Sequence, residues 1–266
     1  MMPAKKNDQY YVIGNPIKHS LSPKIHMEFA LKTRQDICYK ALNICPEKLE
    51  ETLNFLRLET KVKGLSVTFP FKEKLFEYCD ELDDLAQEAQ AVSNVIITEN
   101  RKFIGLNIDG IGFVNDIKNN SSLTLLNKNI LILGAGGAAK GILGAILREN
   151  PASITISNRT KEKAQVLINR ILKTKTKINT CPLEDINDAF DIVINATSAS
   201  ANNENILLKE SYFTKGALGY DLMYGPNGTL FTHWCNTRHI QSRDGKGMLI
   251  ELSKIAFEFW RGVSLS

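Results

Sequence analysis

The most restrictive feature of this sequence is a glycine-rich turn between an apolar run and a helix-like stretch. Residues 130–133 are Ile-Leu-Ile-Leu, and the chain continues as Gly134-Ala135-Gly136-Gly137-Ala138-Ala139. The first glycine of such a pattern permits a tight turn after a strand, and the next lets the backbone approach a pyrophosphate at a helix N-terminus. Glycines also serve turns that bind nothing. The strand before and the helix after favour a dinucleotide site that comprises Gly134, Ala135, Gly136, Gly137 and Ala138.

The end of the next predicted strand indicates which dinucleotide is bound. Residues 153–157 lead into Asn158, Arg159 and Thr160, with Lys163 close by. NAD-specific enzymes usually carry an acid here that accepts the ribose 2′-hydroxyl. A guanidinium instead matches a 2′-phosphate in charge and in fork geometry. We therefore predict NADP as the cofactor, the alternative being that Arg159 is an ordinary surface residue.

Apolar runs alternate with amphipathic stretches along the rest of the chain, which predicts an α/β protein with largely parallel sheets. Helices are expected from Ser22, from Pro46, after the strands at 130–133 and 153–157, and over residues 248–260. Strands are expected at residues 11–13, 39–44, 65–69, 130–133, 153–157, 191–194, 217–221 and near 240, with a hairpin at 95–98 and 102–106. We predict two domains: a substrate-binding and catalytic domain of residues 1–113 completed by a helix in 247–266, and a Rossmann domain of residues 114–246.

Composition narrows the class of protein. Hydrophobic residues make up 43% of the 266 residues, which is typical of a globular protein, and the net charge is only +4. The lysine-rich run at residues 173, 175 and 177 is interpreted as a solvated helix end rather than as a nucleic-acid patch. The five cysteines form no C-x-x-C pair, and the histidines show no ligand spacing, so we expect reduced thiols and no metal.

These features also bear on location and partners. The N-terminus is too polar for a signal peptide, and no apolar run reaches the length of a membrane span. We therefore expect a cytoplasmic protein with a small-molecule substrate and without a nucleic-acid or membrane partner. A homodimer is left open.

Two serines stand before the first predicted helix, in the segment Ser20-Leu21-Ser22-Pro23. Serine followed by proline is typical of a helix start, so Ser22 is expected as the N-cap with Pro23 at the first helical position. A helix N-terminus flanked by two hydroxyls suits a carboxylate ligand. For Ser22 alone, a purely capping role competes with this interpretation.

Further polar groups lie at the ends of predicted strands. Residues 65–69 lead through Pro70 to Lys72, and Asp109 follows the predicted hairpin. Reduction of a ketone needs a hydride on carbon and a proton on oxygen, and a Lys72–Asp109 ion pair suits the handling of that proton. In the second half, the hydroxyl-rich segment 195–200 includes Thr197 and follows a strand, where open sheets bind ligands. Such a segment also serves as a self-capped turn.

Eight motifs occur in a fixed order: GNPIKHSLSP, SVTFPFK, NIDGIGF, GAGGAAKG, NRT, NATS, YDLMY and DGKGML. This set spans nearly the whole chain and resembles the shikimate dehydrogenase family. The resemblance implies two α/β domains with the site in the cleft between them, and the reversible NADPH-dependent reduction of 3-dehydroshikimate to shikimate in aromatic amino acid biosynthesis. It further implies residue roles: Lys72 and Asp109 as the catalytic pair with Lys72 as acid/base, Ser20 and Ser22 on the substrate carboxylate, Thr68 and Asn94 on ring hydroxyls, Tyr224 on the substrate, and Leu222 and Gly245 beside the nicotinamide.

Three positions depart from the family pattern. The usual Asn-Val-Thr begins with Ser66, the usual Asn-Thr-Asp carries Ile108 in its middle, and Leu252 stands where the family has a glutamine. Each change removes or shortens a polar group expected to face the substrate, and a lost hydrogen bond costs on the order of 1 kcal/mol. Two alternatives therefore stay open: a quinate/shikimate dehydrogenase of relaxed specificity, and a weakly active NADP-binding paralogue. Arg159 speaks against an NAD-dependent form of the first.

Overall fold

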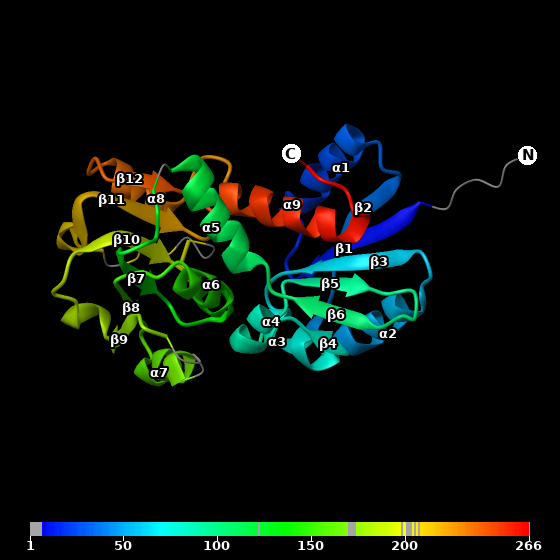
Figure 1. Cartoon of the computed structure of the whole chain (residues 1–266), viewed down its shortest axis with the longest axis horizontal. Helices are drawn as coiled ribbons and strands as arrows, with labels where there is room; N and C mark the ends of the chain where they lie inside the picture. The colour runs from blue at the N-terminus through cyan, green and yellow to red at the C-terminus, as the bar shows by residue number, and fades with distance from the viewer. Residues whose placement is uncertain are drawn as a thin grey trace, which may run out of the picture. The chain divides into compact units, whose positions relative to one another are not determined.

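The chain forms two compact units, which we describe separately. The computed structural model describes residues 7–121, 123–169, 174–197, 199–200, 204, 206 and 208–265. Unit 1 comprises Met1–Ile108 with Ile250–Ser266, and unit 2 comprises Asp109–Leu249 (Figure 1). The chain therefore changes units at the start of helix α5 (Asp109–Asn120) and within helix α9 (Lys246–Arg261). The sequence-based boundaries at 113/114 and 246/247 fall inside the same two helices.

Unit 1 contains a mixed six-stranded sheet with the strand order β2-β1-β3-β5-β6-β4. Strands β1, β2 and β3 are parallel, whereas β5 and β6 form the predicted antiparallel hairpin. Strand β4 was not predicted because its two residues are too short to show a pattern. The elements are β1 (Asp8–Gly14), α1 (Ser22–Thr33), β2 (Ile37–Asn43), α2 (Leu49–Leu58), β3 (Val62–Val67), α3 (Lys72–Leu75), β4 (Glu81–Leu82), α4 (Asp84–Ala89), β5 (Asn94–Ile97) and β6 (Phe103–Leu106).

The C-terminal part of α9 packs on the sheet of unit 1. The Trp260 indole Nε1 donates a hydrogen bond to the Val95 carbonyl at 3.1 Å, and its ring centroid lies 4.8 Å from that of Tyr10. A Cβ atom at Gly64 would lie 2.3 Å from Trp260 Nε1, so only glycine leaves room for the indole. Phe257 is fully buried in the same cluster. Unit 1 thus depends on residues from both ends of the chain.

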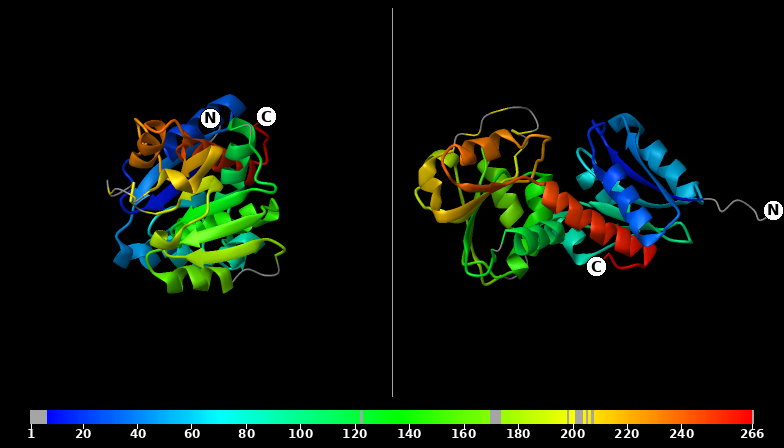
Figure 2. Two further views of the ribbon diagram at one scale, coloured as in Figure 1. Left: turned by 90° about the vertical axis from the view of Figure 1, so that its left-hand side faces the viewer. Right: turned by 90° about the horizontal axis from the view of Figure 1, so that it is seen from above.

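Unit 2 is a parallel, doubly wound sheet with the strand order β12-β11-β10-β7-β8-β9 (Figure 2, green to orange). The first strand, β7, lies in the middle, and the chain winds outward from it in both directions, as in a Rossmann fold. The predicted α/β class and Rossmann domain are confirmed. The elements after α5 are β7 (Asn129–Leu133), α6 (Gly137–Arg148), β8 (Ser153–Ser157), α7 (Lys161–Asn169), β9 (Lys177–Cys181), β10 (Phe190–Asn195), β11 (Phe213–Asp221), α8 (Leu230–Asn236) and β12 (Gln241–Arg243).

The interpretation of the lysine-rich run as a helix end was wrong at Lys177. Lys177 is the first residue of β9, an edge strand that pairs with β8, and Lys173 lies outside the described residues. Ile178 and Thr180 alternate with more exposed residues, as in a half-exposed strand. This alternation is too short to predict a strand from the sequence when lysines flank it. In the part of the chain that the structure describes, no helix is long and apolar enough to cross a bilayer.

Candidate active site

The loops at the carboxyl edge of the unit 2 sheet form one continuous surface. Each loop follows a parallel strand, and neighbouring loops are joined through their backbones. The bonds run from Gly134 N to Ser157 O (2.7 Å), Ala196 N to Leu133 O (2.8 Å), Leu222 N to Asn195 O (3.0 Å) and Gly245 N to Met223 O (2.9 Å). The predicted cofactor residues therefore lie together at the edge where open α/β sheets bind ligands.

The glycine turn leaves open space at the start of α6. Gly134 adopts φ +106°, and a Cβ atom there would lie 2.9 Å from the Ala196 carbonyl oxygen. Both the backbone conformation and the lack of space therefore exclude a larger residue. Gly136 caps α6 without a side chain, and a Cβ atom on it would meet nothing within 4 Å. Ala138 is exposed beside it, whereas Ala135 is buried. The first turn of α6, which begins at Gly137, thus faces open space that an anion can enter.

The end of β8 presents a cation to solvent. Arg159 and Thr160 are exposed and Asn158 is half-buried, with its Nδ2 bonded to the Thr160 carbonyl at 2.8 Å. Lys163, also exposed, lies in the first turn of α7. Among the described residues no carboxylate is paired with Arg159. Such a guanidinium suits a 2′-phosphate in charge and shape, and this role of Arg159 stays a prediction.

The loops after β10 and β11 place the remaining cofactor candidates. Both the amide and the hydroxyl of Thr197 donate to Asn195 Oδ1, at 3.1 and 2.7 Å, which forms a tight turn. Leu222 and Tyr224 are half-buried after β11. Gly245 is buried against Leu222, since a Cβ atom there would lie 2.3 Å from the Leu222 carbonyl oxygen. The turn predicted at this segment is present at Thr197, and the ligand-binding role of Thr197 stays a prediction.

In unit 1 the predicted substrate residues gather at one edge of the sheet. Ser20 and Ser22 follow the end of β1, Thr68 and Lys72 follow the end of β3, and Asn94 opens β5, whose antiparallel direction brings its start to the same edge. The Lys72 carbonyl accepts a hydrogen bond from Val92 N at 2.8 Å, which fixes the start of α3 beside β5.

The expected capping role of Ser22 was wrong. The N-cap of α1 is Leu21, Ser22 is already helical, and the Ser22 amide donates to Ser20 Oγ at 3.3 Å. Proline therefore occupies the second helical position, where its missing N–H is equally harmless. Ser22 is nevertheless buried at this edge of the sheet.

Tyr39 connects these residues and was missed in the sequence. Its hydroxyl donates to Ser66 Oγ at 2.8 Å, and Asn94 Nδ2 donates to the same oxygen at 3.1 Å. Burial raises the pKa of the Tyr39 hydroxyl, with hydrogen bonds to Ser66 and Ser22 opposing the rise, so it stays protonated. A tyrosine in an ordinary β-strand pattern carries no signal of this role. The network shows how serine fits at position 66: it accepts from both neighbours.

The two predicted catalytic residues belong to different units. Lys72 is the first residue of α3 in unit 1, whereas Asp109 is the first residue of α5 in unit 2 and is only 3% exposed. Ile108, directly before Asp109, is buried, and its amide donates to Ser93 Oγ at 2.9 Å. The pairing of Lys72 with Asp109 stays a prediction. Leu252, the third departure, is a half-buried residue of α9 within unit 1.

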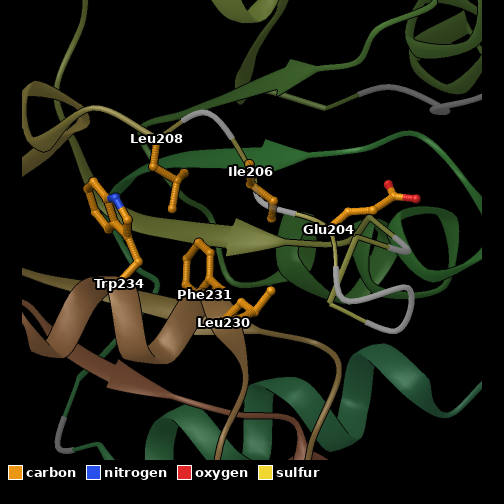
Figure 3. A pocket seen from close by; sticks show the side chains of 6 residues that line it. All are labelled: Glu204, Ile206, Leu208, Leu230, Phe231 and Trp234. Carbon is orange, nitrogen blue, oxygen red and sulfur yellow. The ribbon is translucent and has the colours of Figure 1, made fainter.

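A small pocket in unit 2 lies apart from these residues. It is lined by side chains of α8 and of the segment before β11, as Figure 3 shows, with a volume of about 20 Å³, roughly the space that one water molecule needs. The lining residues are Glu204, Ile206, Leu208, Leu230, Phe231 and Trp234. None of them is a predicted site residue, so this pocket is no part of the candidate site.

Comparison with known proteins matches segments of both units to models of one protein family. Residues 12–96 match the model of the shikimate dehydrogenase substrate binding domain, and residues 117–215 match that of shikimate / quinate 5-dehydrogenase. A relative named shikimate dehydrogenase (NADP(+)) from Herminiimonas arsenicoxydans is 41% identical over 96% of this chain and 93% of its own length.

Solved structures agree. An Ael1 enzyme from Pseudomonas putida superimposes with a TM-score of 0.88 at 36% identity, covering 97% of this chain and 94% of that one. Shikimate 5-dehydrogenase from Thermus thermophilus, solved with NADP(H) and shikimate, gives a TM-score of 0.85 at 26% identity, covering 96% and 94%. Since the similarity takes in both the polar edge of unit 1 and the glycine turn of unit 2, the chain belongs to the shikimate dehydrogenase family.

Proposed function

We propose that this protein is an NADP-dependent shikimate dehydrogenase that interconverts 3-dehydroshikimate and shikimate in aromatic amino acid biosynthesis. One observation carries the proposal: the relative named shikimate dehydrogenase (NADP(+)) is 41% identical over 96% of the chain. The structure supports the choice of cofactor, because Arg159 stands where an NAD-specific enzyme carries an acid.

The residues of the two edges supply what the reaction needs. When bound, the dihydronicotinamide supplies a hydride for the ketone carbon. Lys72 donates the proton that the ketone oxygen takes up, and Asp109 holds the Lys72 ammonium in position. Ser20 and Ser22 hold the substrate carboxylate, while Thr68 and Asn94 bind ring hydroxyls and Tyr224 contacts the substrate. In the other direction Lys72, as a neutral amine, accepts the proton of the same hydroxyl.

Steady-state reduction of NADP⁺ in the presence of shikimate, followed at 340 nm, tests the proposal. Quinate and NAD⁺ are run in parallel at equal concentrations. We expect turnover with shikimate and NADP⁺ and a much lower kcat/KM with NAD⁺. An absence of turnover with shikimate, at NADP⁺ concentrations shown to saturate binding, would refute it.

A relaxed specificity for quinate is the second candidate, and the observation at Ser66 favours it. Ser66 Oγ accepts hydrogen bonds from Tyr39 and Asn94, so it has only its own proton left to donate. An asparagine amide would offer the substrate both a donor and an acceptor. The same assay decides, since comparable kcat/KM values for quinate and shikimate would establish this alternative. Binding of NADP without turnover would indicate the weakly active paralogue.

The cytoplasmic location and the homodimer also stay proposals. The five cysteines are free thiols in the structure, as a reducing compartment requires. Sedimentation velocity at micromolar concentration tests the dimer, which predicts a mass of twice 29.8 kDa.

A further inference from the structure

Asp221, which was not among the predicted site residues, is a buried carboxylate at the centre of the cofactor loops. It is the last residue of β11 and has 0% exposure. Its Oδ1 accepts hydrogen bonds from Asn195 Nδ2 and from the Met223 amide, both at 3.0 Å. Its Oδ2 accepts from the Ser200 hydroxyl.

The donors around this carboxylate are neutral. Asn195, Ser200 and Met223 contribute an amide, a hydroxyl and a backbone N–H. Burial of a carboxylate without a cation is costly, and several converging hydrogen bonds are needed to offset it. Burial raises the pKa of Asp221, and these hydrogen bonds oppose the rise. The Asp221 carboxylate therefore holds its donors in place, because the loss of any donor would leave a buried carboxylate oxygen with fewer hydrogen bonds.

The donors belong to two loops that carry predicted cofactor residues, Thr197 on the first and Leu222 on the second, and Leu222 is one of the two residues predicted beside the nicotinamide. Thr197 is bonded to Asn195 Oδ1, and the other end of the Asn195 amide is bonded to Asp221. On the second loop, the Met223 amide is bonded to Asp221 while the Met223 carbonyl accepts from Gly245 N. Asp221 is thus hydrogen-bonded to Asn195, which holds Thr197, and to Met223, which holds Gly245.

The glycine turn touches the loop after β10 at Ala196, whereas the adenosine end of the site lies farther along the sheet from Asp221. The glycine turn follows β7, and Arg159 follows β8, which lies on the far side of β7 from β10 and β11. A perturbation of Asp221 should therefore affect the loops after β10, β11 and β12, and leave the adenosine half of the site intact.

We propose that Asp221 is a positioning residue that fixes the loops after β10 and β11, and through them Thr197, Leu222 and Gly245, against the nicotinamide half of bound NADP. This inference rests on the proposed function, because it assumes that the dinucleotide site takes NADP. Asp221 itself is too deeply buried to touch the cofactor.

The test compares Asp221→Ala with Asp221→Asn. Alanine removes every acceptor. Asparagine keeps one acceptor oxygen for Asn195 and Met223, and its amide can donate to Ser200, whose hydroxyl rotates to accept. Tyr212→Phe is the matched control, because Tyr212 is equally buried at the opposite end of β11 and loses one hydrogen bond, to the Leu183 carbonyl at 2.9 Å.

Two readouts are needed, of which one requires no turnover. The first is the Kd for NADPH and for 2′,5′-ADP, which lacks the nicotinamide, measured by fluorescence titration and by competition. For Asp221→Ala we expect the NADPH Kd to rise about 3- to 10-fold and the 2′,5′-ADP Kd to stay within about 2-fold. The second is the kinetic split: kcat should fall about 10- to 100-fold, more than the Kd rises, since misplacement by about 1 Å costs on this order. Asp221→Asn should recover most of both losses.

Three results would overturn the inference: equal losses for NADPH and 2′,5′-ADP, losses that Tyr212→Phe reproduces, or wild-type behaviour of Asp221→Ala. Should Asp221→Ala fail to fold, Ser200→Ala carries the test, with the same selectivity for NADPH expected at a smaller size. If the wild type lacks turnover with shikimate, the proposed function fails, whereas the two Kd values still decide the role of Asp221.

Discussion

A single methyl group at Gly247 should destabilise unit 2. Gly247 lies in the first turn of α9, and a Cβ atom there would be 2.0 Å from Asp116 Oδ1, a separation that real Cβ atoms essentially never show. Asp116 is fully buried and accepts hydrogen bonds from Tyr220 (2.7 Å), Asn120 (2.8 Å) and Arg243 (2.9 Å). The Gly247→Ala variant must therefore displace either the carboxylate or the start of α9 by more than an ångström.

The size of the effect follows from that network. Displacing the buried carboxylate weakens its hydrogen bonds to Tyr220, Asn120 and Arg243, and at about 1–3 kcal/mol for each buried polar group left unsatisfied the total is about 3–5 kcal/mol. The better helix propensity of alanine returns about 1 kcal/mol. A net loss of about 2–4 kcal/mol lowers Tm by roughly 10 °C for a chain of this size.

Thermal unfolding followed by circular dichroism measures this loss, and Gly136→Ala is its matched control. Gly136 has an ordinary φ of −85°, and a Cβ atom there meets nothing within 4 Å, so Tm should stay within about 2 °C of the wild type. The same methyl would occupy the space left for a pyrophosphate, so Gly136→Ala should weaken NADPH binding. A Gly247→Ala variant that melts within about 2 °C of the wild type would refute the reasoning.

Three further outcomes are expected. Lys72→Ala should cut turnover about 10²- to 10⁴-fold while the NADPH Kd stays within about 2-fold, and unchanged turnover would remove Lys72 from the mechanism. Arg159→Ser should raise the KM for NADPH about 10-fold and leave the KM for NADH unchanged. The expected rise is at the low end for loss of a charged hydrogen bond because Arg159 is exposed. An equal rise for both cofactors would contradict 2′-phosphate binding. Burial lowers the pKa of His26 to about 3, whereas an unfolded histidine has a pKa of about 6.5, so stability is present above pH 6.5 and is lost as the pH falls. Between pH 7.5 and 5 this loss is about 2 kcal/mol, and His26→Phe should remove it from urea unfolding curves measured at both values; an undiminished loss in His26→Phe would contradict the assignment.

The fold was largely predictable because its signals are local. The apolar run at residues 130–133 and the glycines after it specify a strand, a turn and a helix within ten residues, and the structure has all three. The same holds for the hairpin around residues 95–106. Strands β4 and β9 were missed, since two residues show no period and a half-exposed edge strand shows a weak one.

The candidate site was predictable where a residue acts through its position at a strand end. Arg159 and Gly136 lie where the sequence predicted them, because the carboxyl edge of a parallel sheet follows from the order of strand and helix. Tyr39 and Asp221 were missed because their roles arise from contacts with residues 27 and 26 positions away, which no local pattern records. Whether Lys72 meets Asp109 depends on two separate units, beyond the reach of any local pattern.

The discontinuity of unit 1 affects the order in which the two units can fold during translation. Phe257 and Trp260 complete an aromatic cluster whose other members, such as Tyr10 and Tyr39, are translated before any part of unit 2. Until the ribosome has delivered α9, the first sheet lacks the helix that covers these rings, whereas every strand of unit 2 comes from one uninterrupted stretch. The nascent chain must therefore finish its second unit before its first, and the half-built first unit is the species most open to aggregation and most in need of a chaperone.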